Sequence, residues 1–378
     1  MRVAINAVPL MSTLTGIGYY VRNLSESLLR IGQTETLFFN GTKWSQEIQQ
    51  QMLPAAASRL KRALRNNLPY SYELSRFIQQ IAFSQGVKNC KPDLYHETSF
   101  LSYRFDGPIV LTVHDLSWIR FPETHPVERV RAMHKFFEPS LARADHIITD
   151  ANFVKQELID VFGLDPSKIH PIHLAAEALF KPMRANETET VLQTKGLKHR
   201  QYWLVAGTLE PRKNLELVLE AFSALPAPLR KKTPLVLAGM VGWNVGKLLP
   251  KIEAMEHTGG LVRLGYVSRQ DLATVMAGAK ALILPSIYEG FGLPLVEAMQ
   301  CGTPVLSSNA SCLPEVLDGA GLLFSPNDSD RLKALMLQIL EDDGLTDTLS
   351  AKGLERSQHF DWEKTAQQTL AVYSLAVG

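Results

Sequence analysis

The sequence predicts an α/β fold made of two doubly wound domains, and three observations support it. Short β-rich runs alternate with amphipathic helical patterns, which is typical of parallel sheets joined by crossover helices. This alternating series occurs twice along the chain. The length of 378 residues also suits two domains of roughly 150 residues each.

The first series supplies six expected strands, and one helix stands out between them. Apolar residues at positions 17, 20, 21, 24 and 28 follow the spacing of one helix face. The expected strands of the first half are Val3–Val8, Thr36–Phe39, Asp93–His96, Ile109–His114, His146–Thr149 and Ile169–Ile172. Those of the second half are Tyr202–Ala206, Leu235–Ala238, Leu261–Leu264, Ala281–Leu284, Val305–Leu306 and Leu322–Phe324.

The domain boundary is visible in the composition. Residues 181–200 contain few large apolar side chains and are expected to form a linker and a surface helix, with the joint near Ala176–Asn186. A final helix is expected over Asp361–Ala376, with Asp361 suited to cap it. We therefore expect domains at 1–180 and 181–360 and a C-terminal helix at 361–378.

Charge and composition exclude several classes. With 39 Lys and Arg against 38 Asp and Glu, the chain lacks the basic excess of nucleic-acid-binding proteins. Three widely spaced cysteines cannot form a disulfide framework and suggest a reducing compartment. The N-terminus does not resemble a signal peptide, and no stretch approaches the roughly 18 apolar residues of a membrane span. These observations predict a cytoplasmic protein.

A short basic amphipathic stretch carries Arg59, Lys61, Arg62 and Arg65 between apolar residues that extend to Leu68. Such a pattern fits a solvated helix face as well as a contact with a membrane surface. The sequence leaves both interpretations open.

Several familiar motifs are incomplete. Gly16 and Gly18 begin a dinucleotide fingerprint whose third position is Val21, and the segment from Gly242 to Leu248 is one residue short of a phosphate-binding loop. His170 and His173 lack further metal ligands nearby. The sequence also lacks the G-x-S-x-G, H-E-x-x-H and C-x-x-C motifs. Classical nicotinamide, ATPase, serine hydrolase and zinc chemistry are therefore disfavoured.

The segment LPSIYEGFGLPLVEAMQCGTPV, residues 284–305, combines features of a sugar-phosphate site. Glycines let the backbone approach a ligand, and Pro294 stands where a helix begins. The N–H groups of a helix start attract anionic oxygen. Glu289 and Glu297 are unsuited to phosphate, so hydroxyl groups of a sugar or ribose are their natural partners. A simple strand–turn–helix joint remains the alternative.

The same segment, with its E-x7-E spacing from Glu289 to Glu297, resembles the signature of family 4 glycosyltransferases of the GT-B fold. The resemblance extends over most of the chain. It includes TGIGYYVRNL at Thr15–Leu24, TVHDL at Thr112–Leu116, ITDANFVKQEL, GTLEPRKNLELVLEAF at Gly207–Phe222, LVLAG at Leu235–Gly239 and VRLGYVSRQDL at Val262–Leu272. It implies two Rossmann-like domains facing each other across a cleft, with the last helix returning to the N-terminal domain.

The resemblance also implies roles for the candidate catalytic residues. Arg212 and Lys213 would grip the diphosphate of a sugar nucleotide and stabilise it as it leaves, which suits a guanidinium fork and a point charge. His114 would face the donor sugar near its reacting carbon without acting as a general base. Glu289 would bind the hydroxyls of the sugar.

Further residues are implied in donor binding. Glu297 is expected at the ribose hydroxyls, and the backbone of Gly16 and Gly18 near the phosphates at the carboxyl edge of the first sheet. Backbone atoms of Tyr266 and Val267 would border the nucleobase. The remaining donor contacts are expected from Gly290, Phe291, Gly292 and Leu293.

The resemblance implies a retaining transfer, for which we favour a front-face path in which the leaving diphosphate accepts the acceptor proton. No metal or other cofactor is expected, because Arg212 and Lys213 supply positive charge. The resemblance to bacterial O-antigen and lipopolysaccharide mannosyltransferases suggests GDP-mannose as donor and a lipid-linked oligosaccharide as acceptor, at the inner face of the cell membrane. A UDP-sugar donor, a sugar-nucleotide epimerase and a non-catalytic sugar-nucleotide-binding protein are the alternatives.

Overall fold

A computed structural model describes residues 1–49 and 71–378, and the chain divides into two compact units. Unit 1 comprises Met1–Pro122, Pro126–Leu174 and Trp362–Gly378, and unit 2 comprises Glu123–His125 and Ala175–Asp361. The domain boundaries expected from the sequence lie after residues 180 and 360. The basic stretch from Arg59 to Arg65 lies outside the described residues.

Unit 1 is built on a seven-stranded sheet in the order β3-β2-β1-β4-β5-β6-β7. All neighbouring strands are parallel except the edge pair β2 and β3. The strands are β1 (Arg2–Asn6), β2 (Glu35–Phe39), β3 (Trp44–Ser45), β4 (Leu94–Glu97), β5 (Ile109–Val113), β6 (His146–Thr149) and β7 (Ile169–Pro171). The helices are η1 (Val8–Met11), α1 (Gly16–Ile31), α3 (Ser71–Cys90), α4 (Ser117–Arg120), α5 (Val127–Leu141), α6 (Asn152–Phe162), η3 (Pro166–Lys168) and α16 (Trp362–Val377), with η2 (Pro122–Thr124) at the junction of the two units.

Two local expectations for unit 1 were wrong. The first strand ends at Asn6, whose side-chain oxygen accepts from the Val8 N–H at 3.1 Å, and Val8 begins a 3-10 helix. The two-residue strand β3 was not expected, since so short a segment carries no alternating pattern.

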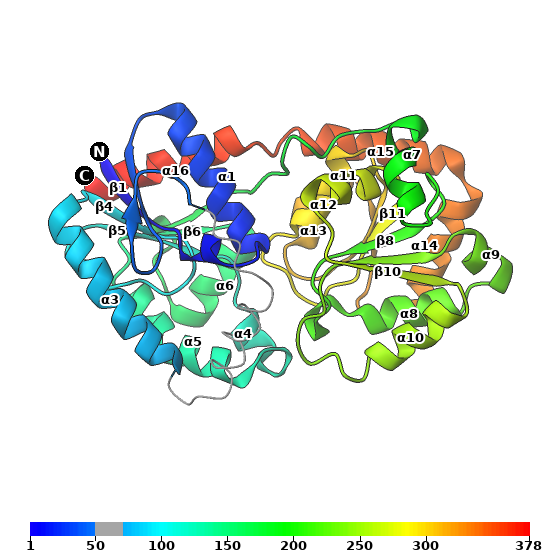
Figure 1. The fold of residues 1–378 in the computed structure, drawn as a ribbon, viewed down its shortest axis with the longest axis horizontal. Helices are drawn as coiled ribbons and strands as arrows, with labels where there is room; N and C mark the ends of the chain where they lie inside the picture. The colour runs from blue at the N-terminus through cyan, green and yellow to red at the C-terminus, as the bar shows by residue number, and fades with distance from the viewer. Residues whose placement is uncertain (50–70) are drawn as a thin grey trace. The chain divides into compact units, whose positions relative to one another are not determined.

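The C-terminal helix α16 packs against α1 within unit 1, and Figure 1 shows the red and blue helices side by side. A buried chain of hydrogen bonds ties it to the sheet. The Tyr373 hydroxyl lies 2.6 Å from His96 Nδ1, and His96 Nε2 lies 2.7 Å from Thr112 Oγ1. Burial, aided by the charge of His114, lowers the pKa of His96 to about 3, so this imidazole is neutral.

Unit 2 repeats the architecture with six parallel strands in the order β10-β9-β8-β11-β12-β13. The strands are β8 (Trp203–Ala206), β9 (Leu235–Ala238), β10 (Leu261–Gly265), β11 (Ala281–Leu284), β12 (Val305–Ser308) and β13 (Leu322–Phe324). The helices are α7 (Ala185–Thr194), η4 (Pro211–Lys213), α8 (Leu215–Ser223), α9 (Ala227–Lys232), α10 (Leu249–His257), α11 (Arg269–Ala277), α12 (Leu293–Gln300), α13 (Leu313–Leu317), α14 (Ser329–Glu341) and α15 (Asp343–Ser357). Figure 1 shows this sheet between α11 and α12 on one face and α8 and α10 on the other.

The two strand orders determine where each unit can hold a ligand. In both sheets the strand order reverses beside the first strand, between β1 and β4 in unit 1 and between β8 and β11 in unit 2. Crossover connections run in opposite directions from such a point and leave a crevice outside the carboxyl ends of the strands, where ligands bind. The doubly wound α/β prediction is confirmed for both units.

Candidate active site

Two loops meet at the reversal point of the unit 2 sheet. One follows β8 and covers residues 207–214, and the other follows β11 and covers residues 285–292. The Ile287 N–H donates to the Arg212 carbonyl at 3.0 Å, and the Asn214 side-chain amide donates to a carbonyl of the second loop at 3.2 Å. These bonds hold the loops together, so the side chains they carry share one site.

A compact ion cluster occupies this site. The Arg212 guanidinium donates to Glu289 Oε2 at 3.0 Å, to Glu210 Oε1 at 2.7 Å and to the Tyr288 carbonyl at 2.7 Å. Lys213 Nζ donates to the other oxygen, Glu289 Oε1, at 2.5 Å. The structure thus brings together three of the four residues expected to be catalytic.

The cluster is buried and fixed. The side chains of Arg212 and Lys213 are only 13% and 15% exposed, so they are not a solvated charge pair. The Ser286 hydroxyl donates to Glu289 Oε1 at 2.6 Å, and the Glu289 N–H donates to Ser311 Oγ at 2.8 Å. Burial alone would raise the pKa of Glu289, but the charges of Lys213 and Arg212 outweigh it and hold the pKa at about 2.

The cluster suits a phosphate ligand. An ammonium carries three donors, and Lys213 Nζ has Glu289 as its one carboxylate partner among the described residues. Gly207 leaves room beside it, since a Cβ there would lie 3.7 Å from Lys213 Cε and the φ of +134° disfavours any side chain. Two preorganised cations at a reversal point can stabilise the negative charge of a leaving diphosphate.

The second glutamate of the E-x7-E pair has different partners. Glu297 is buried on α12 and accepts from the Arg269 guanidinium at 2.8 Å. The same guanidinium pairs with Glu177 at 2.6 Å and lies 4.5 Å from the ring centre of Phe180. Burial would lower the pKa of Arg269, but Glu297 and Glu177 together raise it. Arg269 therefore fixes the carboxylate that is expected to bind ribose.

The glycine-rich turn between Glu289 and Glu297 offers its backbone, rather than its side chains, to a ligand. Gly292 adopts a φ of +89° directly before α12, a conformation that favours glycine. The Phe291 ring is buried and packs edge-on against Phe360 at 5.8 Å, so only its backbone could reach a ligand. Leu293 is half-buried as the first residue of α12, and Gly290 is buried. Their expected donor contacts remain predictions.

Tyr266 and Val267 follow β10, which is an edge strand of the same sheet. The Tyr266 side chain is exposed and Val267 is half-buried. Both residues lie at the carboxyl end of their strand, as the expected nucleobase contact requires, and that role remains a prediction.

Unit 1 carries the other expected donor residues. Gly16 is the first residue of α1, and a side chain there would meet no atom within 4 Å. Gly18 is buried, and a Cβ there would lie 2.8 Å from the end of the Leu14 side chain, which would have to shift. Both glycines follow β1, at the carboxyl edge where they were expected.

His114 directly follows β5 and is buried. Its Nδ1 lies 2.7 Å from Asp150 Oδ2, and its Nε2 lies 2.9 Å from the Thr98 carbonyl. Burial would lower the pKa of His114, but Asp150 outweighs it and raises the pKa above its ordinary value. With both ring nitrogens engaged, the imidazole would have to give up one of these bonds to reach a sugar hydroxyl.

Sequence reasoning missed several residues of the site. Glu210 stands two positions before Arg212, but an acidic residue beside a cation looks like a surface pair. Asp150, the partner of His114, lies in the segment ITDANFVKQEL directly after β6, so its position at the carboxyl end of a strand could have indicated it. Arg269 lies in the segment VRLGYVSRQDL, but nothing in that segment indicates Glu297 as its partner, and Glu177 gave no signal, because only the fold brings both residues to Glu297.

The described residues meet neither the requirements of a metal site nor those of a membrane-spanning helix. Residues 1–49 and 71–378 contain no group of three or more His, Cys, Asp or Glu side chains placed to hold a metal ion. No helix in the same part of the chain has the length and apolar character needed to cross a membrane. Metal-independent chemistry remains a prediction.

Known proteins resemble both units. The family model described as glycosyltransferase family 4 matches residues 14–176, and that described as glycosyl transferases group 1 matches residues 188–356. A curated relative, O-antigen chain mannosyltransferase B of Escherichia coli, is 36% identical over 99% of this chain and 100% of its own length.

Solved structures share the fold. Sucrose-phosphate synthase of Thermosynechococcus elongatus superposes with a TM-score of 0.76 at 21% identity, covering 99% of this chain and 98% of the other. HepE of Anabaena, solved in complex with UDP-glucose, gives a TM-score of 0.73 at 19% identity, covering 99% and 100%. At this identity the likeness concerns the fold alone.

Proposed function

Since the chain belongs to the family 4 and group 1 glycosyltransferases, we propose that it transfers a mannosyl unit from GDP-mannose to a lipid-linked oligosaccharide, with retention of anomeric configuration. The product would be a cell-surface polysaccharide of the O-antigen type. The identity to a named O-antigen chain mannosyltransferase over the whole chain supports the choice of sugar and pathway class.

The ion cluster of Arg212, Lys213 and Glu289 carries the proposal. The cluster lies at the reversal point of the unit 2 sheet, where a nucleotide's diphosphate would meet two fixed cations. Glu289 holds both cations in place and offers acceptor oxygens to sugar hydroxyls nearby. A site of this kind lowers the barrier because its charges are oriented before the reaction begins.

In the proposed reaction, an acceptor hydroxyl oxygen forms a bond to the anomeric carbon while the bond from that carbon to the diphosphate oxygen breaks. The leaving nucleoside diphosphate takes the electron pair of the broken bond and then the proton of the acceptor. Arg212 and Lys213 stabilise the negative charge on the leaving group. Glu297, oriented by Arg269, would fix the nucleoside through its ribose hydroxyls.

Water exclusion and positioning supply the rest of the catalysis. His114, held by Asp150 and Thr98, would border the donor sugar as an immobile group. No metal is required in this scheme, and we expect transfer to continue in EDTA. Loss of activity in EDTA that added divalent cation restores would contradict that part of the proposal.

The donor is the first point to test. The name of the curated relative supports a mannosyl donor, for which we propose GDP-mannose, and a UDP-sugar is the alternative, because the Anabaena neighbour was solved with UDP-glucose. Purified full-length protein would be incubated with each radiolabelled nucleotide sugar and a detergent-solubilised lipid-linked acceptor. Label transfer from GDP-mannose at least tenfold faster than from UDP-glucose or UDP-galactose is expected. The reverse order would replace the donor.

Other functions make different predictions in the same assay. An epimerase would convert the free nucleotide sugar without an acceptor, and a non-catalytic binding protein would bind a donor without turnover. The family models match both units, and these matches favour glycosyl transfer over the epimerase and the non-catalytic binding protein. A control variant, Lys251→Ala, removes an exposed cation that pairs with Glu216 and should transfer sugar normally.

The proposed location follows from the proposed acceptor. A lipid-linked oligosaccharide is held at a membrane, so the enzyme would work in the cytoplasm at the inner face of the cell membrane. The described residues contain no spanning helix, and a peripheral attachment would meet this need.

A further inference from the structure

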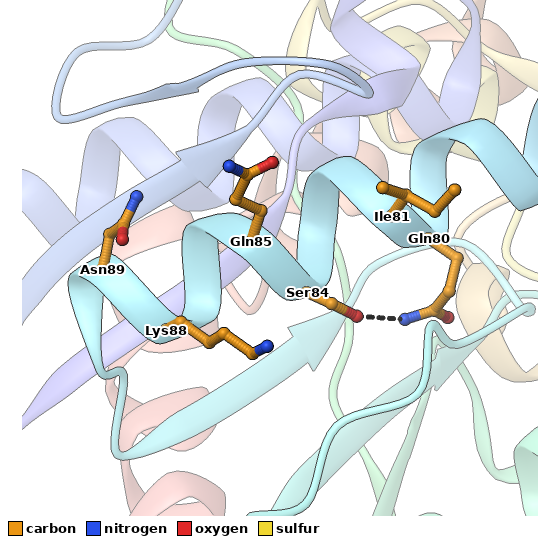
Figure 2. Close-up of a pocket in the computed structure, with 6 residues that line it drawn as sticks. All are labelled: Gln80, Ile81, Ser84, Gln85, Lys88 and Asn89. Atoms are coloured by element: carbon orange, nitrogen blue, oxygen red, sulfur yellow. Dashed lines mark hydrogen bonds between the residues drawn. The ribbon is translucent and has the colours of Figure 1, made fainter.

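The surface depression drawn in Figure 2 lies on α3 of unit 1, where Gln80, Gln85 and Lys88 help to line it. These residues belong to the half of α3 that ends at Cys90 and leads into the amino end of β4. Ligands of doubly wound sheets bind instead outside the carboxyl ends of the strands. That edge of unit 2 holds a buried carboxylate with no part in the proposed reaction.

Glu210 carries this carboxylate, on the loop that follows β8. Its side chain is 5% exposed, and it stands directly before η4, the single turn that holds Arg212 and Lys213. The side chain does not cap that turn. Instead its Oε1 accepts from the Arg212 guanidinium at 2.7 Å, and among the described residues Arg212 is the cation with which it pairs. A buried carboxylate needs such a cation, so the pair is an integral part of the cluster.

Glu210 and Glu289 hold the Arg212 guanidinium from two sides. One Nη atom donates to Glu210, and the other donates to Glu289 and to the Tyr288 carbonyl. Because a guanidinium is planar, partners on both Nη atoms fix the orientation of the whole group. Arg212 is therefore positioned before any ligand arrives.

The same two glutamates balance the charge of the cluster. Arg212 and Lys213 contribute two positive charges. Glu210 and Glu289 contribute two negative charges, so the four side chains together are neutral. A diphosphate is attracted by the cations and repelled by Glu210, and the repulsion lowers its affinity. The nucleoside diphosphate left after transfer meets the same repulsion, and it must leave before the next turnover begins.

We propose that Glu210 is a positioning residue for Arg212, and that its charge keeps the affinity for the nucleoside diphosphate low enough for the product to leave. The inference rests on the proposed function, since it assumes a nucleoside diphosphate at Arg212 and Lys213. Glu210 touches no reacting atom in this scheme and acts on the reaction through Arg212.

Two substitutions in the full-length protein separate geometry from charge. Glu210→Gln keeps an oxygen that can accept from Arg212 and removes the negative charge, whereas Glu210→Ala removes both. Isothermal titration calorimetry measures the binding of GDP, and of UDP as the alternative, without acceptor or metal. Single-turnover transfer with enzyme in excess measures the chemical step apart from product release.

The two variants are expected to separate binding from chemistry. Glu210→Gln should bind the nucleoside diphosphate about threefold more tightly or better, because a like charge beside the ligand is gone. Glu210→Ala should lower the single-turnover rate about tenfold or more, because Arg212 loses a partner that orients it. The rate of Glu210→Gln should exceed that of Glu210→Ala by about threefold or more, since its amide oxygen still orients Arg212.

Glu220→Gln is the matched control, because Glu220 is exposed on α8 of the same unit. It should bind GDP and transfer sugar as the wild type does. Thermal melting checks that each variant folds, and Glu210→Gln keeps the volume of the glutamate if the alanine variant does not fold.

Three results would overturn the inference. Nucleoside diphosphate binding that is unchanged or weaker in Glu210→Gln would contradict the role of the charge. Equal single-turnover rates in Glu210→Ala and wild type, or in Glu210→Ala and Glu210→Gln, would contradict the positioning of Arg212. Binding of neither GDP nor UDP by the wild type would overturn the proposed function together with this inference, whereas wild-type binding that Glu210→Gln leaves unchanged would overturn this inference alone.

Discussion

The carboxyl edges of the two sheets hold their polar groups in opposite ways. In unit 2 the edge presents fixed charges of both signs, with Arg212 and Lys213 sharing the two oxygens of Glu289. In unit 1 most polar groups at the edge bond to one another, although Asp150 Oδ1 is buried without a hydrogen-bond partner among the described residues. Glu97 is fully buried and accepts hydrogen bonds from Asn6, Tyr95 and Ser99. His114 is bonded in the same way to Asp150 and to the Thr98 carbonyl.

The difference shows how one architecture can divide two tasks. The unit 2 edge has cations that are already desolvated and aligned, which suits an anionic diphosphate. The unit 1 edge has almost no unused hydrogen-bonding capacity at His114, which suits a rigid wall. The strand orders alone would not distinguish them, because both sheets reverse direction beside their first strand.

The largest expected effect is at Arg212. Replacing it with alanine removes the donor to Glu289 and Glu210 and one cation for the leaving diphosphate. We expect kcat to fall about 10²- to 10³-fold, the range for loss of one preorganised donor. Turnover of the purified variant is compared with that of Lys251→Ala. A kcat near that of wild type in a folded Arg212→Ala protein would show that the unit 2 edge does not stabilise the leaving group.

Arg269 should affect donor binding more than turnover. Arg269→Ala removes the guanidinium that pairs with the carboxylates of both Glu297 and Glu177. We expect the donor KM to rise about tenfold with kcat changed less than threefold, and Arg269→Lys to recover part of the loss, since lysine lacks the planar fork.

The control for this prediction is Arg263→Ala, which breaks a partly exposed pair with Glu256. If Arg269→Ala lowered kcat and left KM unchanged, Arg269 would not act by positioning Glu297. The double variant with Glu297→Gln should be little worse than either single change, because both alter one interaction.

Acid should weaken unit 2 through Glu289. The folded pKa of about 2 lies below the ordinary value of 4.5, so ionised Glu289 stabilises the fold above about pH 4.5. That contribution falls as the pH decreases through 4.5 toward 2. The difference in free energy of unfolding between wild type and Glu289→Gln should therefore shrink over this range, measured by urea denaturation at several pH values.

Glu216→Gln is the matched control, because Glu216 is an exposed partner of Lys251. Its difference from wild type should vary little with pH. A Glu289→Gln difference that stays constant between neutral and acid pH would contradict the assigned ion cluster.

A smaller, local effect is expected at the unit 1 edge. Asp150 is the largest of the groups that raise the pKa of His114 against burial, so His114 should titrate above its ordinary 6.5 in wild type and at a lower pH in Asp150→Asn, where only the Thr98 carbonyl and Asp115 still oppose burial. Imidazole nitrogen chemical shifts followed by NMR measure both midpoints. The Asp165→Asn protein serves for comparison, because that carboxylate caps η3 elsewhere in unit 1. Identical midpoints in wild type and Asp150→Asn would contradict the pairing.

Much of the fold could be predicted because strand and helix patterns are local. The strands at 146–149, 235–238, 281–284 and 322–324 have the bounds that the sequence predicted. The short strand β3 could not be predicted, since two residues carry no periodicity. Val8 was misplaced because the turn after Asn6 depends on the bond from the Val8 N–H to the Asn6 side chain, which interrupts the strand pattern.

The site could be predicted only as far as its motifs extend along the chain. Arg212, Lys213 and Glu289 stand in recognisable segments, and the fold brings those segments together. The pairing of Glu297 with Arg269 could not be predicted, because Arg269 stands in another segment and Glu177, its second partner, belongs to no motif. The occupied ring nitrogens of His114 depend on the Thr98 carbonyl, and backbone acceptors leave no trace in a sequence.

The central claim is that the unit 2 edge binds a nucleoside diphosphate through its fixed cations. Isothermal titration calorimetry of GDP into wild type and Lys213→Ala, without acceptor or metal, tests it most directly. We predict measurable binding to wild type that weakens with salt, and at least tenfold weaker binding to Lys213→Ala with Lys251→Ala unchanged. Equal GDP affinity in wild type and Lys213→Ala would contradict the claim.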